Sequence, residues 1–445
     1  MEPKSQSDHT SNPFVHNPTM EALLREIESE RLNSRSYSDI VDDEGRQYVD
    51  LVQQGGGVLG IALVGYTYIM EKAGIRFFSL AGTSAGAINT VAMAGMSPIG
   101  EEVSEKILGI LTDLDMFSFV DGGNLIRWLI KRGVSGRAGL FTIAISSLPV
   151  YFRIKRKLGL NPGQEFVNWI DDHVRISSDD GSQSDRASTL AELQAHREKI
   201  PPLKLKGSGQ SIVRRPALKI ITSDVTTKTK VTLPLMADMY WKNPEELPLS
   251  ALVRASMSIP FFFDPMVVTD IPNAGANEDH LGEKETTRWW KYAGYRGEIP
   301  REVRFVDGGM LSNFPINSLH NEKGDPPRKP TFGVLLSSWR NTWSDTSRLS
   351  GFSGAMINTM RQLHDYDFFL RHPEYQKLVC SIDADGVMEK TPDGNEVSKY
   401  NWLDFNMSRE KQIELFLLGA TKAVEFLKGF DWELYKEIRA NTYSG

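Results

Sequence analysis

The residue whose surroundings best suit covalent chemistry is Ser84, which stands in the run Gly82-Thr83-Ser84-Ala85-Gly86. A β-prone run over 75–80 precedes it, and small residues typical of a helix follow it. Flanking glycines allow the sharp strand-to-helix turn, called a nucleophile elbow, that holds a serine hydroxyl clear of the backbone. Free N–H groups at the start of the next helix favour negative charge there. The pattern predicts a nucleophile at Ser84, with an ordinary Gly/Ser-rich turn as the alternative.

A second glycine-rich run, Gly55-Gly56-Gly57-Val58-Leu59-Gly60, follows the β-prone run 48–54. It satisfies the Gly-x-Gly-x-x-Gly pattern of dinucleotide-binding loops. That pattern also needs an acidic residue about 20 positions on, and the run 75–81 ends without one. The other interpretation is an oxyanion hole, in which the N–H groups of Gly55, Gly56 and Gly57 stabilise the oxygen of a tetrahedral intermediate. We favour the oxyanion hole, and nucleotide binding stays the alternative.

A serine hydroxyl attacks well only when a neighbouring base takes its proton. Asp307 ends the apolar run 304–306 and is followed by Gly308 and Gly309, which permit an unusual turn. Active sites gather at the carboxyl ends of strands in α/β sheets. A desolvated carboxylate at this position could act directly as the base, which would give a Ser84–Asp307 dyad. An Asp-Gly turn without a catalytic role is the alternative.

Three histidines, His320, His364 and His372, could complete a triad, because they follow the chain order serine, acid, histidine. None of them directly follows a strand-like run. We therefore expect His364 on a helix and the other two at the surface. A second Asp-Gly-Gly run, at 121–123, lies between helix-like segments and predicts a connecting turn.

Short strand-like runs alternate with helix-like segments along the chain, which predicts an α/β layered fold with a mainly parallel sheet. Besides the runs already named, strands are expected at 217–222, 331–338 and 376–382. Near the end of the chain, apolar residues recur at helical spacing on one face, as in an amphipathic helix: Ile413, Phe416, Leu417, Ala420, Val424 and Leu427.

These elements suggest one catalytic unit with additions. Residues 1–46 are polar and predict an N-terminal extension. The catalytic domain is expected over 47–340, with inserts near 177–215 and 269–302. Residues 341–445 are expected to complete the same α/β domain and to end in the amphipathic helix.

The chain resembles the patatin-like phospholipases over about 47–340. The runs 55–60 and 82–86 are similar to the glycine-rich loop and elbow of that family, including Thr83 and Ala85. Asp307-Gly308-Gly309, with Asn313 and Pro315 downstream, is similar to its Asp-Gly-Gly block. The segment 254–261, Arg-Ala-Ser-Met-Ser-Ile-Pro-Phe, resembles the one that precedes this block in the family.

The resemblance implies a three-layer α/β/α fold, a Ser84–Asp307 dyad and hydrolysis of lipid acyl esters without a metal or cofactor. One position departs from the family pattern, which often has Arg or Lys where Leu59 stands, so a basic contact to a substrate phosphate from this position is absent. An acyltransferase using the same dyad, or a non-catalytic lipid-binding protein, is the alternative.

Composition limits the partners and the location. A net charge of −6 over 445 residues gives no support to nucleic acid binding, and a single cysteine, Cys380, cannot form a disulfide within the chain. No signal peptide and no run long enough to span a bilayer are expected, so a cytoplasmic or peripheral membrane location is predicted. The apolar segment 139–157 ends in a basic cluster and predicts either peripheral membrane contact or a buried helix with a solvated end. The sequence makes no prediction of the oligomeric state.

Overall fold

The computed structural model of the chain describes residues 12–133, 148–176, 186–276, 288–320, 327–339, 343, 346–347, 349–390, 394 and 396–442. Within these residues one mixed sheet of eleven strands forms the centre of the molecule. Its strands are β1 (Ile40–Val41), β2 (Gln47–Gln53), β3 (Ile75–Thr83), β5 (Leu203–Leu205), β6 (Ser211–Ile212), β7 (Leu218–Asp224), β8 (Thr229–Leu233), β10 (Met266–Thr269), β11 (Glu302–Asp307), β12 (Thr331–Leu335) and β13 (Val379–Ser381).

The middle of this sheet is parallel, in the order β13-β12-β2-β3-β7. Every residue of β2, β3 and β12 is buried, as expected for strands covered on both faces. Antiparallel strands flank the parallel middle on both sides: β11, β10 and β8 beyond β7, and β1, β5 and β6 beyond β2. The predicted α/β fold with a parallel core is confirmed.

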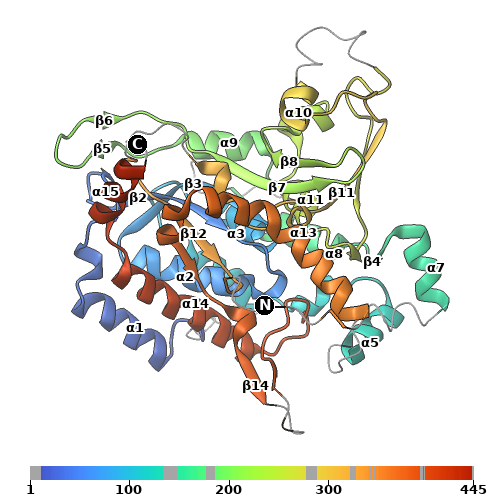
Figure 1. Cartoon of the computed structure of the whole chain (residues 1–445), viewed down its shortest axis with the longest axis horizontal. Coiled ribbons are helices and arrows are strands. Elements are labelled where there is room, and N and C mark those ends of the chain that lie inside the picture. Colours follow the sequence, from blue (N-terminus) through green and yellow to red (C-terminus); the bar gives the residue numbers. More distant parts are fainter. Residues whose placement is uncertain are drawn as a thin grey trace, which may run out of the picture.

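Helices cover both faces of the sheet. Helix α2 (Ile61–Lys72) joins β2 to β3, and α3 (Ala85–Met96) leaves β3 towards β7, so both crossovers run in one direction. Helix α13 (Leu349–Arg371) joins β12 to β13 in the opposite direction. Because parallel crossovers are right-handed, α13 lies on the face opposite α2 and α3, and it crosses in front of the sheet in Figure 1. The three-layer α/β/α arrangement is thereby confirmed.

The α2 face carries a close helix contact. Helix α14 (Arg409–Gly429) packs directly on α2, which is buried from Ile61 to Glu71. A Cβ added to Gly65 would lie 1.9 Å from the carbonyl oxygen of Phe416, and one added to Gly419 would lie 1.9 Å from that of Ala62. The two helices therefore meet backbone to backbone, which only glycine allows at both places.

Residues 12–46 differ from the polar extension that we expected from the sequence. Helix α1 (Pro18–Ser29) begins after the cap residue Asn17, whose side chain accepts a hydrogen bond from the N–H of Met20 at 2.9 Å. The helix packs on α14, so the blue and red ends of the chain lie side by side in Figure 1. Phe14 is fully buried against the ring of Phe416, and β1 pairs with β2. The described part of this range is integral to the domain because several of its apolar side chains, among them Met20, Leu23 and Ile27, are buried in the main hydrophobic core.

The described parts of the two expected inserts are also structured. In the first, helix α9 (Leu190–Glu198) starts with a capping box between Thr189 and Glu192, and β5 extends the sheet by pairing with β1. In the second, a short π-helix (Trp289–Ala293) packs Trp289 against Tyr240, with ring centres 5.3 Å apart. Residues 177–185 and 277–287 lie outside the described part of the chain.

The region 341–445 adds β13 to the sheet, a small hairpin of β14 (Met388–Lys390) and β15 (Glu396–Ser398), and the helix α14. A further helix, α15 (Trp432–Thr442), follows the expected amphipathic helix.

The chain between β3 and β7 contains α4 (Ser104–Thr112), a 3-10 turn (Met116–Phe119), α5 (Asn124–Gly133), α7 (Leu148–Lys157) and α8 (Gln164–His173). Of these, α4, the 3-10 turn and α8 contribute side chains to the space above Ser84. Two short strands, β4 (Gly159–Asn161) after α7 and β9 (Phe261–Phe263) after helix α11 (Leu249–Ser256), pair in parallel.

Candidate active site

Ser84 occupies a sharp turn between β3, which ends at Thr83, and α3, which begins at Ala85. Its backbone has φ 52° and ψ −118°, a strained conformation for a residue with a side chain. A Cβ at Gly82 would lie 2.3 Å from the carbonyl oxygen of Gly86, and a Cβ at Gly86 would lie 2.3 Å from that of Gln53. Both flanking glycines are thus required for the turn. The strand, turn and helix expected around Ser84 are present.

The register of β7 brings Asp307 to this turn. Thr83 at the end of β3 pairs with Ile221, and Asp307 at the end of β11 pairs with the next residue, Thr222. Since β8 occupies the other edge of β7 over these residues, β3 and β11 share one edge and meet end to end. β11 runs antiparallel to β7, so its carboxyl end points at the carboxyl end of β3. The two chain segments thus place Ser84 and Asp307 next to each other.

Asp307 is 6% exposed, and the Ser84 side chain lies next to its carboxylate. Asp307 Oδ1 accepts a hydrogen bond from the N–H of Gly309 at 2.7 Å. Burial raises the pKa of Asp307 above its ordinary value, although the charge of Arg361 and the polar groups of Ser84 and Gly309 oppose the rise. The arrangement pairs a serine hydroxyl with a carboxylate that is a stronger base than a solvated one.

The glycine loop passes over the elbow, and a Cβ at Gly55 would lie 3.0 Å from the Cβ of Ser84. The N–H of Gly55 donates to the carbonyl oxygen of Asn313 at 3.0 Å, so this donor is already occupied. The structure gives the N–H groups of Gly56 and Gly57 no acceptor among the described residues. Of the three oxyanion donors expected from the sequence, these two are therefore available.

Gly57 has φ +56°, and a Cβ there would lie 2.1 Å from the carbonyl oxygen of Trp402. That oxygen also accepts a hydrogen bond from the N–H of Val58 at 3.1 Å. The C-terminal region thereby fixes the shape of the glycine loop.

Helix α13 braces the loop after Asp307, which the sequence alone did not indicate. Arg361 Nη2 donates to Asn313 Oδ1 at 3.0 Å, and Asn313 Nδ2 donates to the carbonyl oxygen of Gly55 at 3.0 Å. One turn further along α13, Asp365 accepts from the Ser312 hydroxyl at 2.8 Å and from the Phe314 N–H at 2.7 Å. Burial raises the pKa of Asp365 to about 7. An arginine and an aspartate four positions apart on an expected helix carry no sequence signal for such a role.

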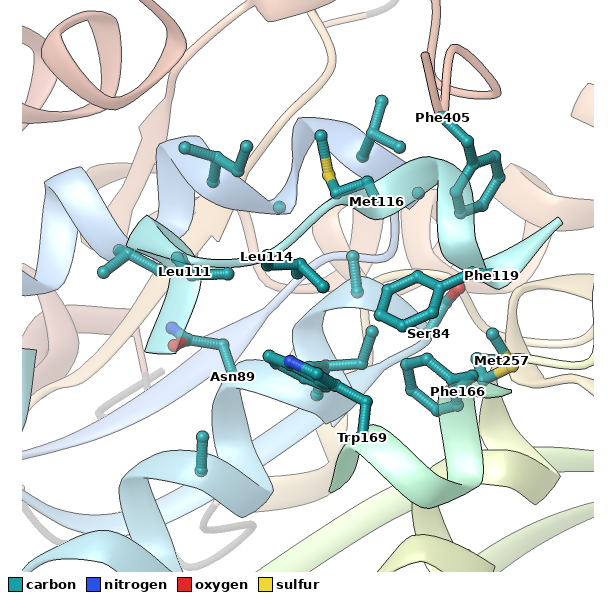
Figure 2. A pocket seen from close by; sticks show the side chains of 18 of the residues that line it. Ser84, Asn89, Leu111, Leu114, Met116, Phe119, Phe166, Trp169, Met257 and Phe405 are labelled. Atoms are coloured by element: carbon teal, nitrogen blue, oxygen red, sulfur yellow. The ribbon is translucent and has the colours of Figure 1, made fainter. Parts of the chain in front are cut away.

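An apolar cavity opens above Ser84 and Gly57 (Figure 2), and the empty space inside it is about 810 Å³, part of it open to solvent. In the figure, Phe119, Phe166 and Met257 surround Ser84, while Leu111, Leu114 and Trp169 line the part further away. No charged side chain lines the cavity among the described residues. Such a space suits a hydrocarbon chain and offers no cation to a pyrophosphate, which argues against the nucleotide alternative.

The three histidines considered for a triad and the second Asp-Gly-Gly run have other surroundings than the Ser84 turn. His320 and His372 lie side by side with ring centres 4.6 Å apart and planes tilted by 46°, and His320 Nδ1 lies 2.6 Å from the Tyr375 hydroxyl. His364 lies within α13, and its side chain is outside the described part. The Asp121 carboxylate accepts hydrogen bonds from the N–H groups at the start of α8, so the second Asp-Gly-Gly run forms a structural turn, as expected.

Two further sequence predictions concern charge and metals. Leu59 is buried and carries no charge to the site. The described residues hold no group of three or more His, Cys, Asp or Glu side chains arranged to bind a metal ion.

The three-layer α/β/α fold thus carries a serine hydroxyl on a strand-to-helix elbow, at the head of an apolar cavity that suits a hydrocarbon chain. The family model described as Patatin-like phospholipase matches residues 51–320, and the chain belongs to this family. Over 392 residues the chain is 27% identical to the uncharacterized protein YqhO of Bacillus subtilis (strain 168), a match that covers 86% of this chain and 98% of YqhO.

Solved structures with some similarity to this chain are less identical in sequence than YqhO. VipD from Legionella pneumophila has a TM-score of 0.38 and 13% identity, over 88% of this chain and 70% of VipD. Human GIVD cytosolic phospholipase A2 has a TM-score of 0.39 and 10% identity, over 96% of this chain and 65% of the human chain. No helix in the described ranges is both long and apolar enough to cross a bilayer.

Proposed function

We propose that this protein is a serine-dependent lipid acyl hydrolase, of the phospholipase A or lysophospholipase type, that works through a Ser84–Asp307 dyad. The observation that carries the proposal is the position of the Ser84 side chain beside the buried carboxylate of Asp307, at the head of the apolar cavity. The engagement of His320 with Tyr375 and His372, away from this pair, supports a dyad over a triad.

In the first half of the reaction, the Ser84 oxygen attacks the ester carbonyl while Asp307 takes its proton. The N–H groups of Gly56 and Gly57 stabilise the negative oxygen of the tetrahedral intermediate. The oxyanion hole therefore has two N–H donors rather than the three expected from the sequence. The intermediate collapses, the alcohol leaves with the proton from Asp307, and the acyl group stays on Ser84.

In the second half, water attacks the acyl-serine and Asp307 accepts a proton from the water. Collapse of the second intermediate releases the fatty acid and returns the proton to Ser84. The acyl chain occupies the cavity between Phe119, Phe166 and Trp169 in both halves. These steps need no metal ion or cofactor.

Covalent trapping tests the nucleophile. A fluorophosphonate, which reacts with activated serines, should add once to the wild-type protein, and intact mass should show no adduct on Ser84→Ala. A matched control is Ser97→Ala, which removes another buried hydroxyl at the far end of α3 and should still be labelled. No adduct on folded wild-type protein would contradict the proposal and favour a non-catalytic lipid-binding protein.

An acyl transfer to an alcohol in place of water uses the same groups. Product analysis with a lipid ester, in the presence and absence of an added alcohol, distinguishes the two reactions. We infer hydrolysis as the main reaction because the family supports a lipid hydrolase.

We further propose that the protein reaches its substrate at an anionic lipid surface. Of the segment 139–157, only 148–157 is described, and it forms α7 with a single buried side chain, Val150. Leu148 is 69% and Phe152 58% exposed, and the basic residues 155–157 follow them in the last turn. The buried-helix alternative from the sequence is contradicted in this part. Exposed apolar groups beside lysine and arginine match the chemistry of an anionic membrane surface.

A further inference from the structure

A second cavity shares no lining residue with the cavity above Ser84. It is lined by residues of α9, by the segment that leads into β7, and by Pro234, and its empty space is about 760 Å³, part of it open to solvent. Leu218 opens β7, and the strand registers place it beside Leu80 in β3, ahead of the elbow. Ser84 stands past the carboxyl end of β3, so this cavity is distinct from the apolar cavity above Ser84, which we call the acyl cavity.

Arg197 lines this cavity and is 6% exposed. Its Nη2 donates to the carbonyl oxygen of Phe78 at 2.5 Å, whereas its Nε is buried without a partner. No acidic side chain forms an ion pair with Arg197 within the described ranges. The carboxylate of Asp50 also acts on the charge of Arg197, but its oxygens are already held by Lys329 and by the N–H of Ser79.

A buried guanidinium without a counter-charge is costly, because removing a charge from water is repaid only by a close opposite charge. Burial lowers the pKa of Arg197 to about 10, so the group is still charged at neutral pH. The rest of the lining is apolar at Leu190, Leu193 and Leu218, and its polar part consists of Gln194 and the ion pair of Arg215 with Glu198 at 3.5 Å. An uncompensated cation at an apolar cavity has the chemistry to hold a ligand with an anionic head and a hydrocarbon body.

We propose that this cavity binds the carboxylate of a fatty acid, with the head paired to Arg197 and the chain against the leucines of α9. Arg215 and Glu198, whose side chains are 88% and 59% exposed, pair with each other at the solvent side of the cavity and add no net charge to it. Binding at this site does not rest on the proposed function, although a fatty acid is the product that the proposed reaction releases.

Calorimetric titration of the full chain tests the proposal with three probes. Octanoate has both the charge and the chain, octanol has the chain alone, and inorganic phosphate has the charge alone. We expect saturable binding of octanoate that is tighter than that of either other probe. In Arg197→Met the octanoate affinity should fall by roughly tenfold or more, since a charge-assisted hydrogen bond is lost.

Two variants control this result. Arg76→Met removes a buried arginine that already has a partner in Glu102, and it should leave octanoate binding unchanged. Gln194→Trp places a bulky ring at an exposed lining position and should weaken octanoate binding even if Arg197→Met does not fold. Equal octanoate affinity in wild type, Arg197→Met and Gln194→Trp would overturn the proposal, because binding would then lie in the acyl cavity or be unspecific. Fluorophosphonate labelling of the same samples reports separately on the proposed nucleophile.

Discussion

At the scale of single residues, the burial of Asp307 is the feature that most affects the proposed chemistry. A base works only when it is ionised, and burial raises the pKa of Asp307 above the ordinary carboxyl value of 3.8. The ionised fraction therefore grows as the pH rises through this raised pKa. The activity should show an acid limb at a higher pH than an exposed carboxylate would give.

Asp307→Asn should lower kcat/KM by roughly a thousandfold, as expected on loss of a general base. The acid limb of the pH profile should disappear from the residual activity. Steady-state rates on a short-chain ester across the pH range measure both effects. Asp121→Asn, in the other Asp-Gly-Gly run, is the matched control and should keep the acid limb. An Asp307→Asn variant with full activity would exclude the dyad and return the histidines to consideration.

At the scale of elements, two helices far along the chain hold the site together. Helix α14 presses backbone to backbone on α2, which begins directly after the glycine loop. Helix α13 holds Asn313, and Asn313 in turn holds Gly55. The catalytic loops therefore depend on residues beyond 340 for their position.

Gly419→Ala should destabilise the protein by about 2 kcal/mol or more, because its Cβ would collide with the backbone of Ala62 rather than with a side chain that can move. Gly429→Ala on the same helix is the control, since a Cβ there meets nothing within 4 Å. It should be neutral or stabilise by about 1 kcal/mol. Urea unfolding of the two variants measures the difference. Equal stability of the two would contradict the close packing of α2 on α14.

The pH dependence of stability tests Asp365 on α13. Its folded pKa of about 7 exceeds the ordinary 3.8, so its protonated form favours folding. This contribution is complete below about pH 4 and is lost as the pH rises towards 7. The free energy of unfolding of the wild type should therefore fall relative to that of Asp365→Asn between about pH 4 and pH 8. Asp172→Asn, which removes an exposed carboxylate, is the control and should show the same pH dependence as the wild type. A difference in free energy of unfolding between wild type and Asp365→Asn that stays constant across this pH range would contradict the prediction.

At the scale of the whole molecule, exposed apolar groups gather beside the acyl cavity. Besides the residues of α7, Leu158 and Phe261 are 43% and 45% exposed, and both have positive φ angles. Gly159 pairs with Phe261 across β4 and β9, so these side chains belong to one surface. Ile259, two residues before Phe261, already lines the acyl cavity. A lipid surface docked here would lie close to the cavity that receives its acyl chain.

Vesicle sedimentation tests this docking surface. The double variant Phe152→Ser and Lys155→Glu should bind phosphatidylserine vesicles roughly tenfold more weakly, because it loses buried apolar area and one basic contact. Leu434→Ser removes an apolar group of similar exposure from α15 and should bind like the wild type. Unchanged binding of the double variant would place the membrane contact elsewhere on the protein.

Local motifs in the sequence were enough to predict the fold class, the elbow and the candidate pair of Ser84 and Asp307. Local sterics are the reason, since a glycine before and after a serine limits how consecutive residues can turn, whatever the rest of the chain does. The polar composition of 1–46 misled the domain assignment because a few apolar residues at the right positions, such as Phe14 and Met20, are enough to dock a helix.

The tertiary structure alone decided how the groups of the site are brought together. The pairing of β3 and β11 along one edge of β7 brings Asp307 to Ser84, and no local pattern encodes that register. The same holds for the occupied N–H of Gly55, the bracing by Arg361 and Asp365, and the unpaired charge of Arg197. Each depends on contacts between distant segments, which are chosen by the burial of whole helices and strands rather than by neighbours in the chain.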